Sequence, residues 1–100
     1  MNDTRQLSDI LTHIQSNSTC FIFGYTSMCG TCQMAERMLN IALDVRDVPI
    51  IKVNLNYVPQ WTQSKEIQSV PILMRFEDGE YVEFMTKMEG VVNIVNFLSK

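Results

Sequence analysis

Apolar residues in the first half of the chain recur at two different spacings. Over residues 7–14 they repeat every three or four positions, which predicts an amphipathic helix that ends at the polar residues 16–18. The next run, residues 20–25, is apolar, aromatic-rich and short, and this pattern indicates a central strand buried on both faces. Over residues 29–45 the helical spacing returns, so a second helix is predicted there.

Residues 49–54 form the next strand-like run. Because a helix separates this run from residues 20–25, a right-handed crossover that makes the two strands parallel is expected. Pro59 then indicates the start of a short helix, which is expected to contain Trp61 and Ile67. Trp61 is expected to pack this helix onto the core, with a role in a partner surface as the alternative.

Two further apolar runs, residues 71–76 and 81–84, flank residues 77–80, which contain an Asp-Gly pair. An Asp-Gly pair between apolar runs predicts an antiparallel hairpin. Gly90 separates this hairpin from a last helix. The predicted order of elements is α-β-α-β-α-β-β-α, which describes an α/β protein with a four-stranded sheet covered by helices on both faces. Residues 1–100 are expected to form a single domain.

Composition and charge narrow the class of protein. Of the 100 residues, 46% are hydrophobic and 19% are charged, a balance typical of a chain that buries a core. The net charge is −3 and the eight basic residues are scattered, which argues against a nucleic-acid or anionic-membrane surface. The first residues are polar with no apolar signal core, and no apolar run approaches membrane-spanning length. A soluble, cytoplasmic protein is therefore expected.

The candidate chemistry lies in Cys29-Gly30-Thr31-Cys32, at the junction between a predicted strand and a predicted helix. A helix start offers unpaired backbone N–H groups and a positive dipole end, and both stabilise a thiolate over a thiol. The three-residue spacing places the second sulfur next to the first, so that a disulfide can close. In a reducing compartment, such a lone pair indicates redox chemistry or metal binding.

A metal site is the weaker interpretation of the two cysteines. Structural zinc needs four ligands, and the chain has only one C-x-x-C. His13 is expected on the polar, solvated side of the first helix, and Cys20 is expected to be a small buried residue, so neither is an evident third ligand. No metal is therefore predicted, and an iron–sulfur cluster that bridges two chains is the remaining alternative.

The order of elements, with C-x-x-C at the start of the second helix, resembles the thioredoxin family. Pro71, in the segment 69–72, is similar to the family's cis-proline, whose loop faces the dithiol. Pro59 lies where a proline opens the family's third helix. Residues 76–80 resemble the family's hairpin turn, and Tyr25 takes the place of an aromatic residue near the active site. The resemblance implies a thioredoxin-like fold with a mixed sheet.

The chain also departs from the family pattern. Met28 precedes the dithiol where tryptophan is common, and Thr31 replaces a proline. Phe23 stands where a buried aspartate is usual, although Lys52, the usual neighbour of that aspartate, is present. The proline that kinks the second helix and a glycine near Lys87 are missing, and no N-terminal strand is expected. The resemblance thus describes a divergent member with a Cys-Gly-Thr-Cys active site.

The resemblance implies roles for individual residues. Cys29 is the implied nucleophile, which forms a mixed disulfide with the substrate, and Cys32 the residue that resolves it. A cis Val70–Pro71 bond is implied to present the backbone of Val70 to an extended substrate strand. Because no carboxylate is expected behind Cys32, its resolving step is predicted to be slow and sensitive to pH. The implied substrate groove is lined by Tyr25, Met28, Gly30, Thr31, Val70 and Pro71, with Thr86 as a further candidate.

The function expected from these features is that of a monomeric, cytoplasmic thiol–disulfide oxidoreductase in cell redox homeostasis. It would reduce protein or small-thiol disulfides without a cofactor other than the Cys29–Cys32 disulfide. A reductase or a low-molecular-weight thiol would recharge it. The alternative is a non-catalytic thioredoxin-like binding module whose dithiol is a redox-responsive latch. The direction of the reaction stays open, because the reduction potential decides between reductase, oxidase and isomerase activity.

Overall fold

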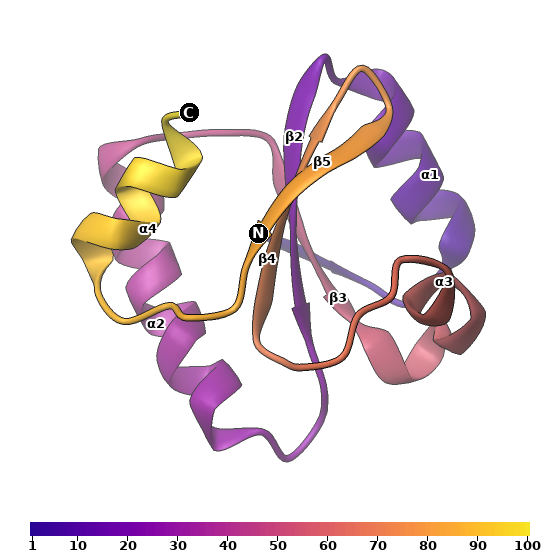
Figure 1. Ribbon diagram of the computed structural model, residues 1–100, viewed down its shortest axis with the longest axis horizontal. Coiled ribbons are helices and arrows are strands. Elements are labelled where there is room, and N and C mark those ends of the chain that lie inside the picture. The colour runs from indigo at the N-terminus through magenta and orange to yellow at the C-terminus, as the bar shows by residue number, and fades with distance from the viewer.

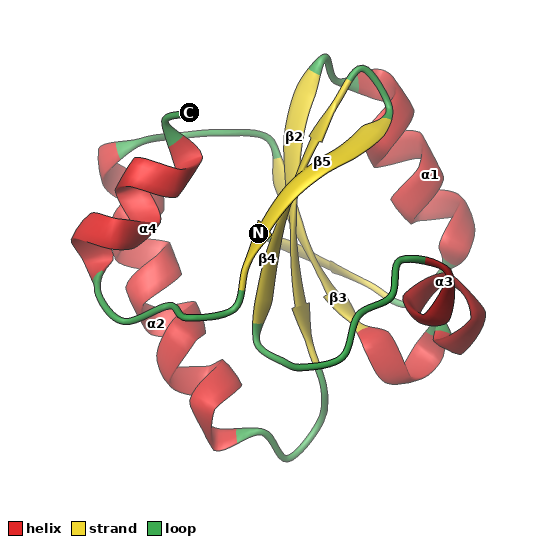
Figure 2. Ribbon diagram, in the orientation of Figure 1, coloured by secondary structure: helices red, strands yellow, loops and turns green.

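The structure is a computed structural model that describes every residue of the chain. A five-stranded sheet with the strand order β1-β3-β2-β4-β5 forms its centre (Figure 1). Figure 2 shows α2 and α4 on one side of this sheet and α1 and α3 on the other. The strands are β1 (Asn2–Thr4), β2 (Thr19–Tyr25), β3 (Ile50–Asn54), β4 (Ile72–Glu77) and β5 (Glu80–Met85). The helices are α1 (Leu7–Ser16), α2 (Gly30–Val45), α3 (Pro59–Ser64) and α4 (Val91–Leu98), with a short 3-10 turn, η1 (Leu55–Tyr57).

The pairing of the strands confirms the predicted α/β topology. Strands β2 and β3 are parallel, with Phe23 opposite Lys52, and α2 is the crossover between them. Strand β4 pairs with β2, and β5 with β4, both antiparallel. At the hairpin turn, Asp78 and Gly79 have φ of 51° and 84°, as a two-residue turn between twisted strands requires. The sheet is therefore mixed, as expected.

The expectation that no N-terminal strand exists is wrong. Residues 2–4 form β1, which pairs in parallel with the edge of β3 and brings the sheet to five strands. The strand is short and polar, so it has no apolar alternation from which it could be predicted. Its place depends on contacts with distant parts of the chain. Thr4 is buried, and its hydroxyl donates a 2.9 Å hydrogen bond to Asp9 Oδ2 at the start of α1.

The short helix α3 begins at Pro59 as predicted, but it is shorter than expected. It ends at Ser64, so Ile67 lies beyond it. The backbone leaves the helical path at Glu66, whose φ is 55°. Trp61 is buried in the core, which confirms that it packs this helix against the rest of the molecule.

Each face of the sheet carries its own apolar core. Strand β2 supplies both, because Cys20 and Ile22 point to the α1 and α3 side while Phe21 and Phe23 point to the α2 and α4 side. All four side chains are fully buried, which confirms the expected central strand. None of the helices is long and apolar enough to cross a membrane.

His13 is not the solvated side chain that the sequence predicts. It is half-buried where α1 meets β2, and its ring Nε2–H donates a 2.9 Å hydrogen bond to the carbonyl oxygen of Phe21. Burial lowers the pKa of His13, and the hydrogen bond to Phe21 opposes this only in part. The helical spacing puts His13 on the polar side of α1, but the edge of that side contacts β2.

Candidate active site

Cys29 is the N-cap residue of α2. Its Sγ accepts a 3.1 Å hydrogen bond from the backbone N–H of Cys32. No acidic residue occupies the first turn of α2, so no carboxylate within that turn offsets the positive end of this helix. The Thr31 hydroxyl lies 3.4 Å from the same sulfur and adds a second donor. This environment stabilises negative charge on Cys29 Sγ.

Cys29 and Cys32 form a disulfide in the structure. Their Cα atoms are 5.2 Å apart, inside the range that an S–S bond spans. Cys29 is half-buried at the mouth of the site, whereas Cys32 is 3% exposed and sits deeper, under the first turn of α2. The arrangement therefore has one accessible sulfur and one shielded sulfur behind it.

The residues around Cys29 leave it open to a partner. Met28 is fully exposed and adopts φ of 59°, a conformation that is uncommon for a residue other than glycine. Gly30 is exposed as well, and a Cβ built on it would meet no atom within 4 Å. Thr31 is also exposed. The structure thus brings these three predicted site residues together at the mouth.

The Val70–Pro71 peptide bond is cis, which confirms that expectation. The bond lies just before β4, and Ile72 of that strand is in register with Gly24 near the end of β2. Since α2 follows β2, this pairing brings the Val70–Pro71 loop to the same end of the sheet as the dithiol. Thr86, the further candidate, lines a separate hollow with Ile72.

Tyr25 lies at this end of the sheet, but its hydroxyl points elsewhere. It donates to the Asp3 carboxylate on β1, with O···O distances of 2.9 and 2.8 Å. In the sheet order, β1 and β4 lie on opposite sides of β2, so the hydroxyl points away from the Val70–Pro71 loop. Burial, with a smaller effect from Asp3, raises the pKa of Tyr25 to about 12. The hydroxyl is therefore neutral across the ordinary pH range.

Glu36 is a neighbour of the dithiol that sequence reasoning missed. Lys52 Nζ lies 2.8 Å from Glu36 Oε2, in a pair whose side chains are 23% and 29% exposed. Glu36 follows Cys32 by four positions in α2, so both side chains lie on the same side of the helix. Phe23 stands on β2 where the family usually has an aspartate, so β2 offers Lys52 no carboxylate. In this chain Glu36 on α2 supplies the carboxylate that pairs with Lys52. The four-residue spacing was the signal in the sequence.

No group of three or more histidine, cysteine, aspartate or glutamate side chains has an arrangement that could hold a metal ion. Cys20 lies in the core on the α1 and α3 side of the sheet, away from the pair. Its thiol donates a 3.7 Å hydrogen bond to the His13 carbonyl, and burial raises the pKa of this thiol. What the site offers is a dithiol that exchanges with a disulfide.

Solved structures with the same fold include several thioredoxins. Mitochondrial thioredoxin 3 from Saccharomyces cerevisiae, in its oxidised form, superposes with a TM-score of 0.85 over 99% of this chain and 93% of its own, at 18% identity. A thioredoxin from Plasmodium falciparum gives 0.87 over 99% and 97%, at 15% identity. At these identities the likeness shows the fold.

The sequence comparisons go further. The family model for thioredoxin matches residues 5–100. The thioredoxin-like protein YusE of Bacillus subtilis is 36% identical over 74 residues, which are 73% of this chain and 69% of that protein. Thioredoxin of Chlamydia trachomatis is 27% identical over 77 residues, which are 76% of each chain. The chain therefore belongs to the thioredoxin family, whose members are thiol–disulfide oxidoreductases.

Proposed function

We propose that this enzyme is a cytoplasmic reductase of protein or small-thiol disulfides, with Cys29 as the nucleophile and Cys32 as the resolving residue. One observation carries the proposal. Cys29 Sγ caps α2, accepts the Cys32 N–H and is accessible, while the partner sulfur is shielded behind it. A single dithiol in a chain with three cysteines suits a reducing compartment such as the cytosol. The enzyme would work as a monomer with one domain.

The proposed reaction moves two electrons from the dithiol to the substrate. The Cys29 thiolate attacks one sulfur of the substrate disulfide, so a Cys29–substrate bond forms and the first substrate thiolate leaves. Cys32 then loses its proton and attacks Cys29 Sγ, which forms the Cys29–Cys32 disulfide and releases the second thiolate. Each released thiolate takes up a proton. A reductase or a low-molecular-weight thiol returns two electrons to the pair.

The residues at the mouth would hold the substrate during this exchange. Met28 offers an exposed, flexible thioether, which suits contact with many different partners. Gly30 leaves space for the incoming disulfide. The Val70–Pro71 loop would offer its backbone to an extended substrate segment beside Cys29. Such a surface favours broad substrate selection.

A trapping experiment tests the proposed roles. The Cys32→Ser variant cannot resolve the mixed disulfide, so it should accumulate several proteins bound through Cys29. The Cys29→Ser variant is the matched control and should trap none. Turnover of a disulfide substrate with dithiothreitol should be lost in Cys29→Ser and slowed in Cys32→Ser, in which only dithiothreitol can release the mixed disulfide. Capture of one protein only, without turnover by the wild-type chain, would instead support the redox-responsive binding module.

The direction of the reaction follows from a separate measurement. The fraction of Cys29–Cys32 disulfide is titrated against glutathione redox buffers. A reduction potential below the cytosolic value is expected for a reductase. A potential well above it would contradict the proposal and indicate an oxidant.

A further inference from the structure

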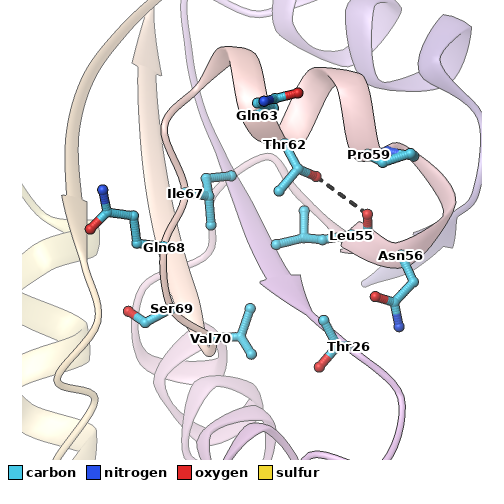
Figure 3. Close-up of a pocket in the computed structure, with 10 residues that line it drawn as sticks. All are labelled: Thr26, Leu55, Asn56, Pro59, Thr62, Gln63, Ile67, Gln68, Ser69 and Val70. Carbon is cyan, nitrogen blue, oxygen red and sulfur yellow. Dashed lines mark hydrogen bonds between the residues drawn. The ribbon is translucent and has the colours of Figure 1, made fainter.

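A hollow of 520 Å³ opens beside the Val70–Pro71 loop (Figure 3). It lies between the β2–α2 loop, η1, α3 and the segment that leads to Pro71. Leu55, Ile67 and Val70 supply its apolar surface. The remaining lining residues are Thr26, Asn56, Pro59, Thr62, Gln63, Gln68 and Ser69.

The lining contains no ionisable side chain, although polar groups are plentiful. Among the side chains of the lining, only the Thr62 hydroxyl is hydrogen-bonded: it lies 3.3 Å from the Leu55 carbonyl oxygen (Figure 3) and 2.9 Å from that of Val58, and donates to them. The amides and the other hydroxyls are therefore free to bond a ligand. The adjacent charged residues Lys65 and Glu66 line a different hollow, which shares Ile67, Gln68 and Ser69 with this one. The chemistry of the surface is neutral throughout.

The hollow borders the two loops that approach the dithiol, because Thr26 of the β2–α2 loop and Val70 of the cis peptide bond both line it. Thr26 lies three positions before Cys29, and Figure 3 shows its side chain at the same end of the hollow as that of Val70. A substrate segment whose cysteine meets Cys29 and whose backbone follows Val70 would pass this opening. In an extended segment, the side chain two positions from the cysteine points to the same face and lies about 7 Å away. In this pose that side chain would enter the hollow.

We propose that this hollow is a specificity subsite for an uncharged side chain, aliphatic or amide, two positions from the substrate cysteine. The inference rests on the proposed reductase function and names its substrate class. A charged side chain of either sign would lose part of its hydration in the hollow. No opposite charge there would compensate for that loss, so its binding would be unfavourable. An aliphatic side chain would contact Leu55, Ile67 and Val70. An amide would also bond the free amides of Gln63 and Asn56.

Four peptides test the subsite. Each carries one cysteine as a mixed disulfide with 2-mercaptoethanol, and the residue two positions away, on either side, is Gln, Leu, Glu or Lys. The kcat/KM for Glu and for Lys should each fall about tenfold below that for Gln and Leu. Simple attraction by the net charge of −3 predicts something else: Lys would gain, Glu would lose, and added salt would remove the difference. That pattern, or equal rates for all four peptides, would overturn the inference.

Two variants locate the effect. Gln63→Lys places a cation in the lining, so it should restore the Glu peptide to near the rate of the Gln peptide and leave the Lys peptide slow. Gln60→Lys is the matched control, because it adds the same charge to the same helix outside the lining, and it should leave the four-peptide ranking as in the wild type. Equal effects of the two variants would contradict the subsite.

A small neutral disulfide separates this inference from the proposed function. Bis(2-hydroxyethyl) disulfide has no side chain that reaches the hollow. Its turnover by the wild-type chain, together with equal rates for the four peptides, would remove the subsite and leave the reductase in place. Failure to turn over either kind of substrate would overturn both.

Discussion

Cys29 and Cys20 are two cysteines of one chain in opposite environments. The Cys29 sulfur accepts a backbone N–H at a helix start, whereas Cys20 is fully buried in an apolar core that raises its pKa. In the reduced protein at neutral pH, iodoacetamide should therefore modify Cys29 first and leave Cys20 unmodified, as followed by mass spectrometry. Thr31→Val, which removes the hydroxyl near Sγ, should slow the modification of Cys29 about threefold. A rate typical of an unperturbed thiol at Cys29 would contradict the assignment of the nucleophile.

Glu36 lies one turn beyond Cys32 in α2, and Lys52 is the only cation that forms an ion pair with it. Lys52→Met removes this positive charge and leaves Glu36 unpaired, which makes ionisation of the Cys32 thiol less favourable. Release of substrate from the mixed disulfide should slow by roughly three- to tenfold at neutral pH, and its pH profile should move to higher pH. Glu36→Gln should shift the profile in the opposite direction.

Lys52→Met and Glu36→Gln should shift the pH profile in opposite directions. Stopped-flow measurement of the resolving step between pH 6 and 9 distinguishes the two shifts. Arg37→Gln is a suitable control, because Arg37 is exposed on α2 and forms no ion pair. Unchanged profiles for both Lys52→Met and Glu36→Gln would show that the pair has no influence on the dithiol.

Strand β2 runs through the centre of the sheet and ends directly before the active-site loop. Near that end, Gly24 passes close to its neighbours: a Cβ on it would lie 2.8 Å from Ile72 Cγ2 and 3.1 Å from Leu55 Cδ1. Gly24→Ala should therefore lower the free energy of unfolding by about 1–3 kcal/mol, measured by urea denaturation. Gly30→Ala, where the added carbon meets nothing within 4 Å, should not destabilise the protein. Equal stabilities of the two variants would contradict the close contact at Gly24.

Most elements could be predicted from the sequence because their signals are local. The helical spacing of α1, α2 and α4, the apolar run of β2 and the Asp-Gly turn of the hairpin each lie within one short segment. Strand β1 could not be predicted, because Asn2-Asp3-Thr4 has no apolar pattern and depends on the edge of β3. The end of α3 was missed for a similar reason, since only the left-handed backbone at Glu66 marks it.

The candidate site was predictable where its residues lie near the dithiol in the sequence or match the pattern of the thioredoxin family. The Cys29–Cys32 pair, its place at a helix start and the cis bond before Pro71 all agree with the sequence-based expectations. The direction of the Tyr25 hydroxyl was not predictable, because it is decided by Asp3 on a strand that the pattern does not reveal. The four-residue spacing from Cys32 could have pointed to Glu36, but its pairing with Lys52 was not predictable, because that pair joins a helix to a strand across the sheet face.

The stability of the whole molecule should depend on pH through His13, which links α1 to the central strand. Its folded-state pKa lies below the ordinary value of about 6.5, so the unfolded chain takes up a proton first as the pH falls. The stability that this residue contributes is thus present above about pH 6.5 and is lost as the pH falls towards the folded pKa. Urea denaturation at pH 7.5 and pH 5 should show a larger loss for the wild type than for His13→Gln. The same loss in both proteins would assign the acid sensitivity to other groups.

The three-residue strand β1 helps to fix the end of the sheet at which the dithiol lies. Asn2–Thr4 is anchored along β3, and Asp3 secures the phenol that lies four residues ahead of the nucleophile. Any fusion or truncation that detaches this strand would free the Tyr25 side chain, which packs against the apolar core under α2. Kinetic comparisons between variants are therefore best made on protein in which the pairing of β1 with β3 is intact.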